Sequence, residues 1–183
     1  MKIGLISDTH IPKRSTKIPE KVFESFKDVD LILHAGDLTD ESVINDLESL
    51  APVIAVQGNV DILTGLDLPK SKVITVGKMK IGLIHGNIRP RGDTQQLYYL
   101  AKELDANILV SGHTHIPMAE QIEDVLLLNP GSPTAPRLAD PSVMILEITD
   151  DNEVDVEVIK IGAPVCSSLQ FAQSRVESSK KLD

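Results

Sequence analysis

Two histidines stand one residue apart in the stretch Ser111-Gly-His113-Thr-His115, directly after an aliphatic run at residues 108–110. If this stretch is extended, alternate side chains point to the same face, and both imidazoles would lie together. Because imidazole is a common metal ligand, the spacing predicts that two neighbouring metal ions each take one of these histidines. The stretch Asp8-Thr-His10 repeats the same gap of one residue.

Side chains of metal-ligand type also follow four other short aliphatic runs, in most cases beside a glycine. They are Asp8 and His10, Asp37, Asn59, and His85. In open α/β sheets, ligands bind at the carboxyl ends of the strands. We therefore expect these side chains, far apart in the sequence, to converge on one edge of the fold.

The chemistry of this set indicates catalytic metals. It contains nitrogen and oxygen donors but no cysteine, which suits Mn, Fe, Zn, Ni or Co better than a structural, thiolate-rich zinc site. Seven residues are more than one ion needs. Two ions ~3.5–4 Å apart are the recurring arrangement for phosphoester hydrolysis, because they acidify bound water and absorb charge on the phosphoryl oxygens.

The elements that position these residues are short strands and amphipathic helices. We expect strands at residues 3–6, 31–35, 53–56, 73–76, 81–84, 108–110, 120–128, 143–148 and 154–159. Pro19 should begin one helix, Thr39 or Asp40 should cap a second, and Asp93 with Gln96 resembles a capping box for a third. Alternating α and β units followed by a β-rich end predict an α/β (α+β) fold of stacked sheets flanked by helices.

Composition bounds the organisation and the class of protein. The length of 183 residues predicts one domain over residues 1–165 and a polar tail, helical or disordered, over residues 166–183. The net charge of −9 argues against a non-specific nucleic-acid binder, although bound cations would reverse the local field. A single cysteine, no visible signal peptide and no apolar run near ~20 residues predict a cytoplasmic protein without membrane association.

The ordered motifs resemble those of the calcineurin-like metallophosphoesterase superfamily. The matching stretches are Asp8-x-His10, Gly36-Asp37, Gly58-Asn59, His85 and Gly112-His-x-His115, which span residues 1–150 or so. The short chain, with Asn129-Pro-Gly-Ser132 after the last motif, is similar to the small microbial phosphodiesterase branch. The resemblance implies a four-layer αββα sandwich, two stacked mixed β-sheets flanked by helices, with a dinuclear site at one edge.

The resemblance also implies roles for the motif residues. Asp8, His10 and His115 would bind the first of two divalent metal ions, and Asn59, His85 and His113 the second. Asp37 would bridge the two ions, and a hydroxide between them would attack phosphorus. Asp37, Asn59 and His85 are accordingly the implied catalytic residues. Manganese is the expected metal, with Ni, Fe, Co and Zn as alternatives.

One motif position departs from the family. The family motif reads Gly-Asn-His-Asp or Gly-Asn-His-Glu, whereas this chain reads Gly58-Asn-Val60-Asp61. In the family that histidine contacts the phosphate and is the usual candidate for protonating the leaving group, and Val60 can do neither. Alkoxide leaving groups need such an acid and activated ones do not. Asp61 is a weak candidate for a replacement acid.

Other polar residues have a functional and a structural interpretation. Arg89, Arg91 and Arg137 suit substrate phosphate as well as they suit a solvated surface. No motif position claims His34, so a hydrogen-bonded or core role is expected. Tyr98 and Tyr99 are expected to pack on a helix, and residues 129–132 to form a turn near the site.

These observations favour a metal-dependent phosphodiesterase acting on a small phosphoester. The alternatives are a phosphomonoesterase, a catalytically weak or inactive protein-interaction scaffold on the same fold, and a protein with purely structural metals. The superfamily includes a retromer subunit that serves as such a scaffold, but scaffolds tend to lose ligands, and all seven positions here keep them. Because the small branch often forms dimers or tetramers, a homo-oligomer is also open.

Overall fold

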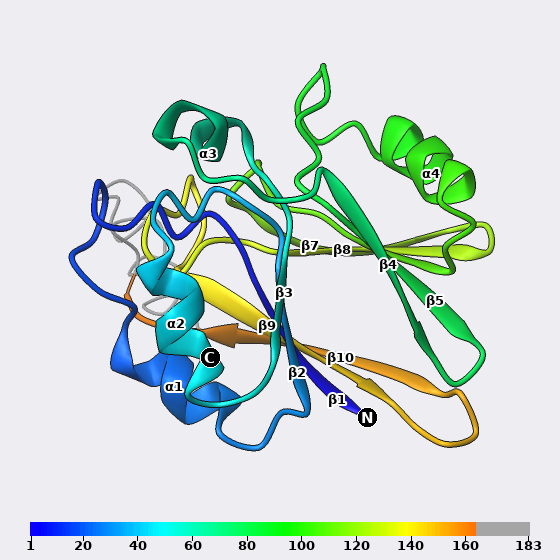
Figure 1. Ribbon diagram of the computed structural model, residues 1–183. Coiled ribbons are helices and arrows are strands. Elements are labelled where there is room, and N and C mark those ends of the chain that lie inside the picture. The colour runs from blue at the N-terminus through cyan, green and yellow to red at the C-terminus, as the bar shows by residue number, and fades with distance from the viewer. Residues whose placement is uncertain (164–183) are drawn as a thin grey trace, which may run out of the picture.

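In the computed structural model, which describes residues 1–163, the aliphatic segments form two mixed β-sheets (Figure 1). The first sheet has the order β10 (Val154–Lys160), β9 (Ser142–Ile148), β1 (Lys2–Ile6), β2 (Leu31–His34) and β3 (Val53–Ala55). The second has the order β4 (Ser71–Val76), β5 (Met79–Ile84), β6 (Ile108–Val110), β8 (Val125–Pro130) and β7 (Pro117–Ile122). The predicted tail at residues 166–183 lies outside the described residues.

The register of the parallel strands brings their ends to one edge. In the first sheet Ile6 lies beside His34, and His34 lies beside Ala55. In the second sheet Leu83 lies beside Val110, and Val110 beside Leu128. The loops that follow β1, β2, β3, β5, β6 and β8 therefore leave the sheets close together, as the motif positions require.

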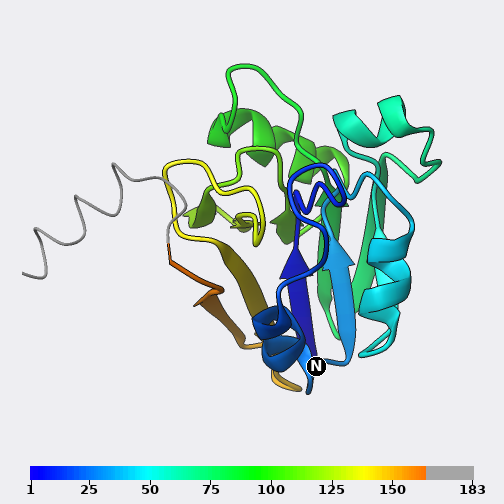
Figure 2. The same cartoon turned by 90° about the vertical axis from the view of Figure 1, so that its left-hand side faces the viewer.

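The helices cover the two outer faces of the sheets (Figures 1 and 2). Helices α1 (Glu20–Phe26) and α2 (Ser42–Glu48) pack on the first sheet, and α4 (Thr94–Glu103) packs on the second. Between the sheets lies an aliphatic core that includes Ile3, Leu5, Leu83 and Ile108. The predicted four-layer αββα order is confirmed.

Side-chain alternation along β1 links two of these layers. Ile3 and Leu5 face the second sheet, whereas Ile6 faces the helices. Gly4 lies on the helix side, where a β-carbon would stand 3.1 Å from the ring of Phe26. The missing side chain lets the fully buried Phe26 of α1 pack directly on the strand backbone.

Most predicted boundaries are confirmed within a few residues. Helix α1 begins at Glu20, directly after Pro19, and the Asp93 carboxylate accepts the backbone N–H of Gln96 at 3.0 Å at the start of α4. At the start of α2, the Asp40 carboxylate accepts the backbone N–H of Ser42 at 2.9 Å.

One local prediction was wrong, and one helix was not predicted. The expected single strand at residues 120–128 is a hairpin, because β7 and β8 reverse at Glu123, whose φ is 50°, and Asp124. Helix α3 (Asn59–Thr64) carries no apolar stripe that would mark it as a helix in the sequence. Its apolar residues Ile62 and Leu63 are 61% and 80% exposed. Within residues 1–163, no helix is long and apolar enough to cross a membrane.

Replacing Phe26 should test the layer of α1 on β1. We expect Phe26→Ala to lower the free energy of unfolding by about 3–5 kcal/mol, because it leaves a cavity above Gly4. Phe23→Ala, on the same helix but only partly buried, should cost about 1 kcal/mol. Urea denaturation measures both, and equal losses would contradict the packing described here.

Candidate metal centre

The loops after five strands bring all seven predicted ligand residues to one site. Asp8 and His10 follow β1, Asp37 follows β2, Asn59 begins α3 after β3, His85 follows β5, and His113 and His115 follow β6. Two groups of ligand atoms lie within 4.8 Å of one another, one in Asp8, His10 and His115 and the other in Asp8, Asp37 and His85. Each could hold a metal ion.

The distances join the two predicted halves of the centre through Asp37. In the first half, His115 Nε2 lies 3.2 Å from Asp8 Oδ1 and 3.4 Å from His10 Nε2. In the second half, His85 Nε2 lies 3.2 Å from Asn59 Oδ1 and 3.3 Å from His113 Nδ1. Asp37 Oδ2 stands 3.7 Å from His10 Nε2 and 3.4 Å from His85 Nε2, a position from which it could contact both ions.

Most of these residues have a left-handed backbone. Five of the seven have positive φ, namely Asp8, His10, Asp37, His113 and His115, with values of 46–68°. The expectation that His113 and His115 are extended was therefore wrong. The chain changes direction at each of these two left-handed residues. The side chain of His113 therefore lies beside His85, and that of His115 lies beside His10. Such conformations cost about 1–3 kcal/mol each and cluster at functional sites.

The polar atoms at the centre are mostly acceptors that face one another. His85 Nδ1 lies 2.7 Å from the Ala35 carbonyl oxygen, and His115 Nδ1 contacts the Ala135 carbonyl oxygen. A carbonyl only accepts, so each Nδ1 carries a proton, and the Nε2 lone pair of a neutral ring faces a carboxylate. Asp8 Oδ1 is buried and has no hydrogen bond in the described structure. A cation between these atoms would satisfy them, so the residues fit a metal.

The raised pKa values of His85 and His115 also indicate that the centre lacks positive charge. Burial lowers the pKa of His85, but the hydrogen bond with Asp37 and the charges of Asp8 and Asp37 outweigh it and raise the pKa to about 9. Burial also lowers the pKa of His115, and its contact with Asp8 reverses the direction. Protons on these rings take the place of a cation, and metal binding would displace them.

The loop after β8 holds the Asp8 turn in place, which the sequence reasoning did not assign. The Ser132 hydroxyl donates to the Asp8 carbonyl oxygen at 2.8 Å, and the Thr134 hydroxyl donates to the Thr9 carbonyl oxygen at 2.6 Å. The Ser7 hydroxyl lies 2.7 Å from Asp8 Oδ2. The predicted turn at residues 129–132 does lie at the site. The hydroxyl residues in and after this turn were the sequence feature that could have indicated its contact with the Asp8 loop.

Asp61 cannot replace the missing motif histidine. Its fully buried carboxylate accepts the backbone N–H groups of Asp37, Thr39 and Gly58 at 2.8, 2.7 and 2.7 Å. It therefore ties the loop after β3 to the Asp37 turn. The two loops touch so closely that a β-carbon on Gly58 would lie 2.1 Å from Asp37 Oδ1, which requires glycine there.

His34 has the core role expected for it. Its Nδ1 accepts the Gly36 N–H at 3.2 Å, so its Nε2–H donates to the Thr9 hydroxyl, also at 3.2 Å. Complete burial lowers the pKa of His34 to about 3. The neutral ring joins the two turns that carry Asp8 and Asp37.

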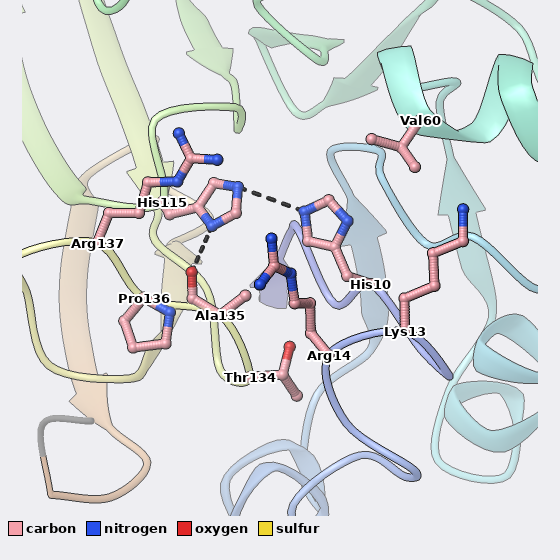
Figure 3. Close-up of a pocket in the computed structure, with 9 residues that line it drawn as sticks. All are labelled: His10, Lys13, Arg14, Val60, His115, Thr134, Ala135, Pro136 and Arg137. Atoms are coloured by element: carbon pink, nitrogen blue, oxygen red, sulfur yellow. Dashed lines mark hydrogen bonds between the residues drawn. The ribbon is translucent and has the colours of Figure 1, made fainter. Parts of the chain in front are cut away.

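Three of the cavities within residues 1–163 border the centre, and one of them, of about 450 Å³, adjoins Asn59 and His85. Another, of about 480 Å³, adjoins His10 and His115 (Figure 3) and is lined further by Lys13, Arg14, Val60, Thr134, Ala135, Pro136 and Arg137. The third, of about 360 Å³, adjoins Asn59 and His113, and Arg89 and Arg91 line it. All three predicted arginines thus line a cavity at the centre, whereas Lys13 and Arg14 were not predicted. Tyr98 packs elsewhere, donating to Glu123 at 2.7 Å.

Comparisons with known proteins identify the family. The model of the calcineurin-like phosphoesterase superfamily domain matches residues 1–151. A "probable metallophosphoesterase" of Methanothermobacter thermautotrophicus is 58% identical over 171 residues, covering 93% of this chain and 99% of that protein.

Solved structures show the same fold. A single mutant of Vps29 from Entamoeba histolytica superposes with a TM-score of 0.74 at 33% identity, covering 87% of this chain and 99% of that one. A structure described as a novel archaeal phosphodiesterase has a TM-score of 0.65 at 28% identity, covering 87% and 100%.

Neutralising Asp61 should lower both the stability of the fold and the affinity of the centre for metal, because Asp61 holds together the loops that carry Asp37 and Asn59. We expect Asp61→Asn to lower the free energy of unfolding by about 1–3 kcal/mol, because the amide presents a donor to backbone N–H groups. The variant should also bind less manganese. Asp67→Asn, on the exposed side of the same region, should change stability by less than about 0.5 kcal/mol. Normal stability and metal content with a shifted pH–rate profile would instead make Asp61 an acid.

His34 should make the metal-free protein sensitive to acid. The unfolded chain takes up a proton on His34 below about pH 6.5, whereas the folded chain does so only near pH 3, so stability falls as the pH drops through this window. The loss approaches about 1.4 kcal/mol per pH unit. Urea denaturation of wild type and His34→Gln in chelator, at pH 7.5 and 5, measures it. The variant should lose less stability, and equal losses would contradict a neutral His34.

Proposed function

The chain belongs to the calcineurin-like phosphoesterase superfamily, and from that membership we propose that it is a phosphodiesterase that uses two divalent metal ions at this centre. The observation that carries the proposal is the set of seven converging side chains around Asp8 Oδ1, a buried oxygen without a hydrogen bond. The likeness to an archaeal phosphodiesterase supports it.

The distances support a division of the ligands between two ions. We assign Asp8, His10 and His115 to one ion, Asn59, His85 and His113 to the other, and Asp37 to both. Two divalent cations would supply an activated water at neutral pH and would neutralise charge on the phosphoryl oxygens. Oxygen and nitrogen donors without thiolate suit manganese, and Fe, Co, Ni and Zn as well.

The chain's own part in the reaction is orientation. The Ala35 and Ala135 carbonyls fix the rings of His85 and His115, so their Nε2 atoms point into the centre. Asp37 Oδ1 accepts the Val60 N–H at 2.7 Å, which leaves Oδ2 directed at the metal positions. Groups held in this way need no reorganisation when charge develops on the substrate.

Cavities on both halves of the centre favour a diester over a monoester. A phosphodiester carries a substituent on two sides of the phosphorus, and a cavity adjoins each half of the centre. A monoester would use only one of them. Arg89 and Arg91 on one side and Arg137 on the other would contact the phosphate or its substituents. A single guanidinium group can donate two parallel hydrogen bonds to phosphate oxygens.

A protein-interaction scaffold is the second candidate. It is favoured by the likeness to Vps29 and by Val60, which stands where the superfamily motif has a histidine. Retention of all seven ligand-type residues favours the enzyme. A scaffold needs no such set of strained, converging side chains.

Removing one ligand should separate these candidates. We expect wild type to bind about two manganese ions per chain and to hydrolyse bis(4-nitrophenyl) phosphate. His113→Ala should bind fewer ions and lose at least about 100-fold in rate, because one ion loses a ligand from its inner sphere. Metal analysis by mass spectrometry and nitrophenolate release measure the two effects.

The control is Asp40→Ala, an exposed carboxylate three residues from Asp37. It should retain metal content and rate. Wild type that takes up no metal, or that binds two ions but cleaves neither the diester nor 4-nitrophenyl phosphate, would contradict the proposed enzyme.

A further inference from the structure

We infer that the cavity beside His10 and His115 receives the leaving group of the substrate, and that this leaving group is a phosphate. The bond cleaved would then be a phosphoanhydride, P–O–P, and not the ester bond of an alcohol. The inference rests on the proposed phosphodiesterase function and names its substrate class. It follows from three features of the cavity: unpaired cations, their attachment to the ligand loops, and Val60.

Three cations line this cavity without acidic partners. Lys13, Arg14 and Arg137 are exposed, and none forms an ion pair within residues 1–163. Within residues 1–163, Lys17, Lys27, Lys80, Lys102 and Lys160 form ion pairs and the other lysines and arginines do not, so what sets these three apart is that they line one cavity to which no carboxylate contributes. Unpaired positive charge gathered around one hollow attracts an anion.

The backbone ties two of these cations, Arg14 and Arg137, to the metal-ligand loops. Arg14 N–H donates to the His10 carbonyl oxygen at 2.8 Å, and Arg137 N–H lies 3.5 Å from the His115 carbonyl oxygen. Figure 3 shows the guanidinium of Arg14 extending toward the pair of imidazoles. Together with Lys13, which lines the same cavity, these cations lie at the end of the centre where His10 and His115 stand.

The same cavity offers little to an alkoxide. Val60, Ala135 and Pro136 line it, and its only histidines are the two at the metal centre. No carboxyl group lines it either. An alkoxide needs a proton as it departs, whereas a phosphate, with a second pKa near ~6, leaves as a stable anion. Lys13, Arg14 and Arg137 would stabilise that anion by charge, so the missing histidine is not needed.

The reaction balances with water alone. The oxygen of water forms a bond to the attacked phosphorus, while the bond from that phosphorus to the bridging oxygen breaks. The electron pair of the broken bond leaves with the bridging oxygen on the departing phosphate. The two protons of water pass to the products and the buffer, and no oxidant or reductant takes part.

The test compares leaving groups on matched substrates. Manganese-loaded protein is given diadenosine 5′,5′-pyrophosphate, adenylyl-(3′→5′)-adenosine and bis(4-nitrophenyl) phosphate. We expect kcat/KM for the pyrophosphate to exceed that for the alkyl diester by at least about 10-fold, because only the first has a leaving group that departs as an anion.

Variants test the assignment to this cavity. Lys13→Met, Arg14→Gln and Arg137→Gln should each lower kcat/KM for the pyrophosphate by about 10- to 100-fold, the usual effect of losing a charged hydrogen bond. The effect of Lys13→Met and Arg14→Gln on the aryl diester should stay within about 3-fold, whereas Arg137, which is also proposed to contact the phosphate, carries no such expectation. Adenosine 5′-monophosphate, the departing product, should bind Arg14→Gln about 10-fold more weakly by calorimetry. Lys17→Met, in the same loop but outside the cavity, is the control and should match wild type.

Each outcome decides between the two proposals. Cleavage of the aryl diester without a preference for the pyrophosphate would overturn the inference and leave the phosphodiesterase standing. Failure to cleave any of the three compounds would overturn both. A preference for the pyrophosphate that all three variants retain would overturn the assignment of its leaving group to this cavity.

Discussion

The centre of the molecule is a cluster of acceptor atoms that would repel one another without a cation. Asp8 Oδ1, Asp37 Oδ2 and the Nε2 atoms of His85 and His115 lie 3.2–3.4 Å from a facing acceptor. The carbonyls of Ala35 and Ala135 hold the rings so that these lone pairs point inward. In the absence of metal, protons on the histidines relieve the repulsion, as the raised pKa of His85 shows. Folding therefore brings together acceptor atoms that a cation would satisfy, and metal binding would displace the protons from these rings.

Keeping such a cluster together requires a rigid frame. Five of its residues have left-handed backbone, at about 1–3 kcal/mol each. Backbone hydrogen bonds between the turns hold that strain: Asp8 N–H donates to Gly36 at 3.0 Å, and Gly112 N–H donates to His85 at 3.1 Å. The parallel strands beneath are locked by aliphatic cores on both faces. The turns therefore have little room to relax. The Asp61 carboxylate restricts them further, because it accepts the backbone N–H groups of both Gly58 and Asp37.

The sequence predicted the layers and the composition of the site because both follow from local pattern. Aliphatic runs mark buried strands, and the residue after each run lies at the strand end whatever path the turn takes. The turns themselves were not predictable, since left-handed His113 and His115 look like extended residues when only spacing is considered. The hairpin at Glu123 lacks the glycine or asparagine that marks such a reversal. Arg14 was missed because an exposed cation becomes meaningful only when its cavity and its lack of partners are seen.

The distribution of charge connects the metal centre with the identity of the substrate. An acidic chain repels anions in general, so a phosphate compound reaches the site only if the local field is reversed. Metal ions would reverse it at the phosphorus, but their ligands neutralise part of their charge, and the attraction weakens with distance toward the leaving group. Lys13, Arg14 and Arg137 extend the positive region into one cavity, and Arg89 and Arg91 extend it into a second. Val60 removes the usual proton donor from a wall of the first cavity, which is also the cavity with the additional cations. The cations of this cavity can stabilise a departing anion in place of a proton donor. This is sufficient only when the leaving group is a stable anion.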